Sequence, residues 1–193
     1  MELYKFGIKF FTEPELNIQV NEFIPEFHHW IQTDAVQNHL LIDVVDYSHI
    51  SDGPGIMLIA HEGQFSFDLE SELPGFMYQR RTEIEGDFNQ RLASVFSTTA
   101  KAVRQLERNS LGKPIQFKTN IFRFIANDRL AAENSDEKQN LYKESVHTFI
   151  QRKFQGSKLE IENISSKNER LAFNVKAQED INFLMSTEEG NNE

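Results

Sequence analysis

Histidines and carboxylates are concentrated in one segment near the start of the chain. Five of the six histidines lie there, namely His28, His29, His39, His49 and His61. Imidazole and carboxylate groups bind divalent metals and transfer protons near neutral pH. The side chains that could form such a site are His28, Asp43, Asp46, His49, His61 and Glu62. This polar cluster predicts, as one alternative, a metal-dependent or acid–base enzyme.

The spacing within the polar cluster favours structural roles over a metal site. The chain contains no HExxH-type motif and no cysteine that could supply a thiolate ligand. Asp43 and His49 share one face of an expected strand, but they are too far apart along it to touch. His28 is expected at the border of a buried helix face, where an imidazole usually donates one structural hydrogen bond. We therefore assign no metal ligand, and the cofactor stays open.

A glycine-proline-glycine turn, Gly53-Pro54-Gly55, interrupts the polar cluster. Phosphate-binding loops place their glycines directly before the amino terminus of a helix, whereas a strand pattern follows this turn. The turn is therefore expected to close a hairpin rather than to bind a phosphate.

Three arginines at the ends of expected strands form a second candidate site. They are Arg80, Arg81 and Arg129, in a chain that is otherwise acidic. A guanidinium at such a position can bind a carboxylate or a phosphate. The alternative is a solvated rim, in which charged neighbours such as Glu83 and Glu85 surround the arginines.

The composition is that of one globular domain. Among 193 residues, 39% are hydrophobic and 17 are phenylalanine, so Phe is expected to dominate a single core. We predict one domain over residues 1–185 and a flexible acidic tail over residues 186–193.

The formal net charge of -10 repels phosphates, which disfavours nucleic acid as a partner. No apolar stretch has the length of a membrane span or a signal-peptide core, so we expect a cytoplasmic protein that binds no membrane.

Two apolar periodicities predict an α+β fold. Residues 2–11 alternate in the manner of a strand with one buried face, with Phe6, Ile8 and Phe10 opposite Lys9. Helices are expected after Asn21, Asp87 and Ser135, the last two of which supply side-chain caps. Further strands are expected over residues 40–47, 56–62, 65–69, 76–78, 115–126, 159–164 and 171–175. These elements predict an antiparallel sheet covered by three helices.

The two ends of the chain share a weak internal similarity. Residues 28–32 (HHWIQ) align with residues 147–151 (HTFIQ) at an offset of 147 minus 28, or 119, and the same offset pairs Leu40 with Leu159. Each half then reads strand, helix, hairpin, so residues 2–80 and 115–177 are expected to be two βαββ units joined by the central helix. Chance likeness between amphipathic helices is the competing explanation.

Four segments of the chain resemble a family of uncharacterised bacterial proteins. They are residues 27–32 (FHHWIQ), 41–49 (LIDVVDYSH), 53–62 (GPGIMLIAHE) and 127–130 (NDRL). The resemblance covers about residues 4–132. It implies a bacterial source, and no activity is attached to the family.

Three functions follow from these patterns. We expect first a noncatalytic domain that binds a small molecule or a protein partner, in a Phe-rich apolar groove between the two halves. The second is the enzyme centred on the polar cluster. The third is an assembly protein that presents Phe65, Phe67, Phe76 and Tyr78 on strands at a sheet edge. The oligomeric state stays open.

Overall fold

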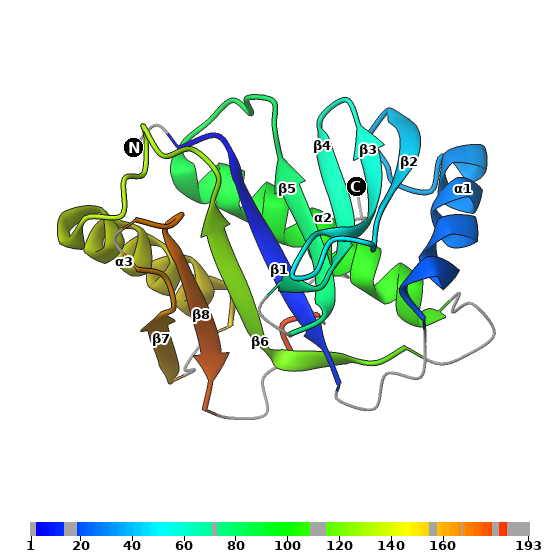
Figure 1. The fold of residues 1–193 in the computed structure, drawn as a ribbon. Helices are drawn as coiled ribbons and strands as arrows, with labels where there is room; N and C mark the ends of the chain where they lie inside the picture. Colours follow the sequence, from blue (N-terminus) through cyan, green and yellow to red (C-terminus); the bar gives the residue numbers. More distant parts are fainter. Residues whose placement is uncertain are drawn as a thin grey trace, which may run out of the picture.

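One antiparallel sheet organises the molecule in the computed structural model (Figure 1). The structure describes residues 3–13, 19–70, 73–108, 115–154, 158–166, 168–178 and 182–184, and in these ranges the sheet has eight strands. They are β1 (Phe6–Thr12), β2 (Leu41–Tyr47), β3 (Gly55–Ala60), β4 (Gly63–Asp68), β5 (Gly75–Arg80), β6 (Phe117–Ala126), β7 (Leu159–Asn163) and β8 (Ala172–Ala177). Their order across the sheet is β2-β3-β4-β5-β1-β6-β8-β7. The predicted α+β class is confirmed.

Three α-helices occur in the described ranges, and they begin where the sequence places them. They are α1 (Phe23–Thr33), which follows the short 3-10 helix η1 (Val20–Glu22), α2 (Phe88–Arg108) and α3 (Asp136–Lys153). Before α2, Asp87 Oδ1 accepts from Gln90 N and Gln90 Oε1 accepts from Asp87 N, both at 2.8 Å. This reciprocal pair satisfies two backbone donors that the first turn leaves without partners. Ser135 Oγ caps α3 by accepting from Lys138 N.

All three helices pack on one face of the sheet and enclose the phenylalanine core (Figure 1). Aromatic pairs join each helix to the strands: Phe23 to Phe67 for α1, Phe96 to Phe10 for α2, and Tyr142 to Phe124 for α3. Offset and edge-on ring pairs of this kind stabilise by about 0.5–1.5 kcal/mol beyond the area that they bury. The expected dominance of Phe in the core is confirmed.

Strand β1 is buried on both faces, whereas the alternation predicted one exposed face. Lys9 points away from the helices, yet its exposed fraction is 0%. Its Nζ donates to Asp68 Oδ2 on β4 at 2.5 Å, and Asp68 is 1% exposed. Burial lowers the pKa of the Lys9 ammonium, and the adjacent Asp68 carboxylate opposes that effect. An internal ion pair therefore takes the place of the expected contact with solvent.

Strands β4 and β5 lie inside the sheet, so the predicted exposed edge is wrong. Phe65, Phe67 and Phe76 are 0% exposed and Tyr78 is 1% exposed. Because β1 pairs with β5 and β3 pairs with β4, neither strand has a free edge. The strands at the two edges of the described sheet are β2 and β7.

The helix-free face of the sheet, which we call the outer face, is crossed by two connections. Leu69 N, directly after β4, donates to Gly53 O in the β2–β3 turn at 3.1 Å, so these two connections lie side by side. The turn ends at Gly55, whose φ is 63° and whose missing Cβ leaves room for the Phe67 carbonyl. As expected, the Gly53-Pro54-Gly55 segment closes a hairpin.

The strand order also bears on the internal similarity. The β4–β5 hairpin adjoins β1, and the β7–β8 hairpin adjoins β6. The sequence instead aligned β2 with β7, and β2 lies at the far edge of the sheet. Duplication of residues 2–80 and 115–177 stays a prediction, and its residue equivalences do not follow the strand order.

Strands β1 and β8 come from opposite ends of the described chain, and both pair with strand β6. No helix in the described ranges has the length and apolar character needed to cross a membrane. The predicted tail, residues 186–193, lies outside the described residues.

The Lys9–Asp68 pair gives the first testable prediction. Replacing Lys9 by Met leaves the Asp68 carboxylate buried without its counter-ion, which should lower the free energy of unfolding by about 3–5 kcal/mol. Chemical denaturation measures this loss. The double variant Lys9→Met/Asp68→Leu removes both charges and should recover most of the stability. A single variant within about 1 kcal/mol of the wild type would show that the pair is hydrated.

Candidate functional site

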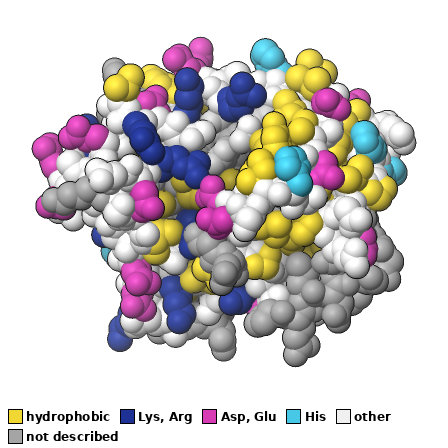
Figure 2. All heavy atoms as spheres, viewed as in Figure 1, with side chains coloured by type: hydrophobic (Ala, Val, Ile, Leu, Met, Phe, Trp, Pro, Cys, Tyr) yellow, Lys and Arg dark blue, Asp and Glu magenta, His cyan; other side chains and the backbone are white. Residues whose placement is uncertain are grey.

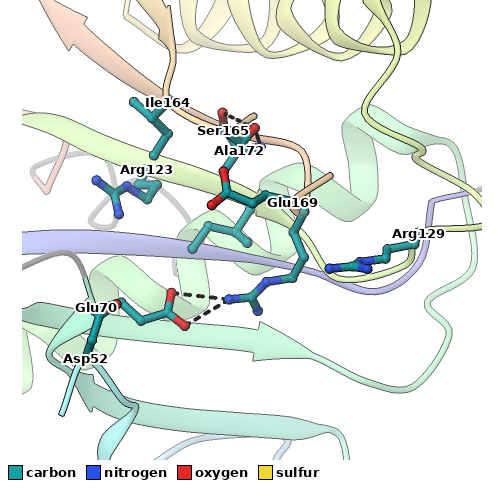
Figure 3. Close-up of a pocket in the computed structure, with 10 residues that line it drawn as sticks. Asp52, Glu70, Arg123, Arg129, Ile164, Ser165, Glu169 and Ala172 are labelled. Carbon is teal, nitrogen blue, oxygen red and sulfur yellow. Dashed lines mark hydrogen bonds and ion pairs between the residues drawn. The ribbon is translucent and has the colours of Figure 1, made fainter. Parts of the chain in front are cut away.

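A polar pocket opens on the outer face, where the two halves of the chain meet (Figure 3). Its volume is about 270 Å³. The front half contributes Asp52 from the β2–β3 turn and Glu70 from the segment after β4. The back half contributes the other lining residues, Arg123, Ile125, Arg129, Ile164, Ser165, Glu169, Arg170 and Ala172. The pocket is therefore built by segments that are far apart in the sequence.

Arg123 is the most deeply placed charge of the pocket. It is 5% exposed, and it lies on β6 in register with Lys9 of β1 and Asn174 of β8. Its Nε donates to Asn174 Oδ1 at 3.0 Å, and its guanidinium lies 5.1 Å from the centre of the Phe11 ring. Burial lowers the pKa of Arg123, and the more distant charges of Asp68 and Glu70 oppose this effect. In the described part of the chain, no carboxylate lies within ion-pair distance of this guanidinium.

A second arginine of the pocket is already paired. Arg170 Nη2 donates to both carboxylate oxygens of Glu70, at 2.9 and 3.2 Å, and both side chains are about one third exposed. This pair joins the segment after β4 to the segment before β8, and it closes one side of the pocket (Figure 3). Glu169, on the exposed rim, accepts a hydrogen bond from Ser166 N at 2.7 Å, which lowers the pKa of its carboxyl group.

The predicted arginines separate in the structure. Arg129 lines the pocket, and its side chain is exposed (Figure 3). Arg80 does not line it, because its Nε donates to Thr82 O at 3.2 Å on another part of the surface. Arg81 is exposed and also lies outside the pocket. Sequence analysis thus located one of the three arginines that line the pocket, and it missed Arg123 and Arg170.

The polar cluster is spread over the α1–β3 region. His28 and His29 are exposed on α1, whose buried face is formed by Phe23, Glu26, Phe27 and Trp30. His28 therefore lies outside that buried face, whereas the sequence predicted it at the border. The described residues show no buried hydrogen bond of its side chain. His61 N donates to Leu40 O at one end of β2, whereas His49 stacks on Tyr47 at the other end. A seven-residue strand separates these two ends by about 20 Å.

The carboxylates of the polar cluster bond to nearby backbone groups. Asp43 Oδ1 accepts from Val44 N at 2.8 Å, and Glu62 Oε2 accepts from Leu40 N at 2.9 Å. Asp46 Oδ1 accepts from the backbone and hydroxyl of Ser48, and these bonds lower the pKa of Asp46. Within the described ranges, no three His, Asp or Glu side chains are grouped so that they could hold a metal ion.

His39 forms a half-buried polar contact that sequence analysis did not select. Its Nδ1 lies 3.0 Å from Gln37 O, and its Nε2 lies 2.7 Å from the Tyr78 hydroxyl. When Nδ1–H donates to the Gln37 carbonyl, Nε2 accepts from the Tyr78 hydroxyl, which fixes the neutral tautomer. Burial lowers the pKa of His39 and raises that of Tyr78. The only feature of the sequence that pointed to His39 was the number of histidines in the surrounding segment.

Comparison with known proteins adds no relative: no family model matches the chain, and no curated protein is significantly similar to it. The resemblance to a family of uncharacterised bacterial proteins stays a prediction. Arguments about function therefore rest on the side chains alone.

His39 gives a prediction about pH. Because its pKa is lower in the folded state, its contribution to stability is complete above the unfolded value of about 6.5 and is lost as pH falls from there through the folded pKa. The difference in unfolding free energy between the wild type and His39→Gln should therefore shrink on acidification. Denaturation at several pH values measures it. Gln37→Ala keeps the accepting carbonyl and should retain the wild-type profile, and a pH-independent difference would contradict the assignment.

Proposed function

We propose that this protein is a noncatalytic binding protein, cytoplasmic and bacterial, whose outer-face pocket takes a small anionic ligand. The ligand class is a carboxylate or a phosphate ester, since a planar guanidinium binds both in the same two-pronged geometry. This replaces the expected apolar ligand, because the phenylalanines lie between the sheet and the helices rather than in a groove.

The proposal rests on Arg123, whose guanidinium is buried without a carboxylate within ion-pair distance among the described residues. A buried charge without a counter-ion is unfavourable, so buried guanidinium groups are normally paired with carboxylates. Arg123 has a neutral amide and an aromatic ring instead. The neighbouring acids are engaged elsewhere, with Asp68 bonded to Lys9 and Glu70 bonded to Arg170. An anion in the pocket would supply the close counter-charge that Arg123 lacks among the described residues.

The remaining charges of the pocket are mixed, since Arg129 adds positive charge whereas Asp52 and Glu169 add negative charge. Arg129 lines the same pocket from the segment after β6, at the opposite end from Arg123 in Figure 3, and it adds a second positive charge to the lining. Ser165 also lines the pocket, but its hydroxyl already accepts from Asn134 Nδ2 and Ala172 N within the protein. A volume of about 270 Å³ is below the roughly 300–1,000 Å³ of pockets that bury drug-sized molecules, which favours a metabolite of few atoms.

The enzyme centred on the polar cluster is less well supported. Catalysis needs an acid or base within hydrogen-bond reach of the reacting group, together with a cavity that holds the substrate. His49 and His61 lie at opposite ends of β2, and neither lines the described pocket. The metal-dependent or acid–base activity stays a prediction without a supporting contact.

Anion binding is tested by thermal denaturation and calorimetry with inorganic phosphate and with succinate. A ligand at about 100 times its Kd stabilises the native state by about 2.7 kcal/mol, so the Tm should rise with ligand concentration. Arg123→Gln should weaken binding at least tenfold. Comparing the two probes distinguishes a phosphate ligand from a carboxylate.

Two further variants separate binding from folding. Arg129→Gln changes an exposed side chain, so the variant should keep the fold and still bind the anion more weakly. Arg81→Gln is the matched control, since Arg81 is exposed outside the pocket. Equal responses of wild type, Arg129→Gln and Arg81→Gln, or no response to either probe, would refute the proposed function.

A further inference from the structure

Fixed positive charge is absent from a long part of the chain. Between Lys9 and Arg80 the sequence contains no lysine or arginine, while aspartates and glutamates occur throughout this stretch. The stretch forms α1 and strands β2 to β5. In Figure 2, Lys and Arg side chains accordingly gather on the left of the outer face, and none appears among the described residues over β2 and β3 on the right. On the face drawn in Figure 2, the described surface over β2 and β3 therefore carries acidic side chains and no lysine or arginine.

The same region exposes large apolar side chains. Leu40 is 64% exposed, Ile42 56%, Tyr47 37% and Ile50 43%, and all four lie on or beside the edge strand β2. They are half of the large hydrophobic side chains that are exposed in the described part of the chain. Figure 2 shows hydrophobic surface gathered here, with histidine and acidic side chains within it. These side chains form a strip along one edge strand, and exposed apolar surface concentrated in this way marks an interaction site more often than residues scattered singly.

Acidic groups border this apolar surface and restrict how a partner can bind. Asp43 and Asp46 are exposed on opposite faces of β2, because they stand opposite Ile59 and Ile56 of β3, and Glu62 lies beside the start of the strand. The Asp43 carboxylate accepts from Val44 N, so that edge amide is already occupied. Charged side chains that cover edge amides hinder the addition of another strand. A partner is thus expected to contact the side chains of β2 and its flanking turns.

We propose that the surface formed by residues 40–50 and Glu62 is a docking site for a basic protein, whose contact surface combines lysine or arginine with an apolar centre. Charge complementarity selects this occupant, since apolar contacts provide affinity and opposite charges speed association. A second copy of the chain would bring Asp43 and Asp46 against identical carboxylates. Nucleic acids and anionic membranes would be repelled for the same reason. The proposal does not depend on the anion pocket.

The experiment uses the full chain and a short probe peptide of alternating lysine and leucine, with a glutamate–leucine peptide for comparison. Amide NMR spectra should shift at residues 40–50 and 61–62 on adding the basic peptide, and not on adding the acidic one. Fluorescence anisotropy should show affinity that falls as salt is raised. Ile42→Ser should weaken binding about tenfold, which corresponds to 1.4 kcal/mol. Asp43→Asn/Asp46→Asn keeps the oxygen acceptors and should reduce the dependence on salt.

The opposite edge strand supplies the matched control. Strand β7 also alternates exposed acids with apolar residues, so Glu160→Gln/Glu162→Gln tests general attraction of cations. Wild-type affinity in this variant supports a specific surface on β2. Equal losses of peptide affinity in the β2 and β7 variants, amide signals that shift outside residues 40–62, or no binding would overturn the proposal. A stable dimer in analytical ultracentrifugation that Ile42→Ser dissociates would also overturn it.

Discussion

The buried ion pair between Lys9 and Asp68 is the interaction on which the outer face depends. It joins the central strand β1 to β4 across β5, with neither charge reachable by solvent. Lys9 Nζ also approaches Glu70 O at 3.4 Å, and the Glu70 side chain in turn holds Arg170. Because an unpaired charge at this depth costs several kcal/mol, the pair fixes where the chain can run after β4. The pocket wall formed by Glu70 is a consequence of that constraint.

Most helices and strands follow from local rules, and these are the features that the sequence predicts well. Asp87 and Gln90 specify the start of α2 through two short hydrogen bonds between neighbours. The alternation in β1 correctly identified a strand. It could not reveal that Lys9 is buried, because burial on the second face depends on Asp68, which is 59 residues away. Period-two patterns report the local backbone and leave the strand order undetermined.

Strand order explains the errors about edges and sites as well. The local strand pattern predicts Phe65 and Tyr78 at an edge because it does not reveal pairing partners, yet β5 pairs with β1 and becomes internal. Arg123 occupies a polar position in a phenylalanine-rich strand, where a solvated side chain is the usual expectation. Its register with Lys9 and Asn174 decides its environment, and that register is a property of three strands together. The number of histidines in one segment suggested a site, but His49 and His61 lie at opposite ends of β2.

Local and overall charge have different effects on what the pocket can bind. With a net charge of -10, the molecule repels extended polyanions, which must pass along its acidic surface. Screening limits that repulsion to about 8–10 Å at moderate ionic strength. A small anion bound as proposed would lie beside the buried Arg123, where the dielectric constant is lower and the nearest charges dominate. Under the proposed function, a net acidic protein with the buried Arg123 in its pocket would discriminate by size, favouring single carboxylates or phosphates over nucleic acids.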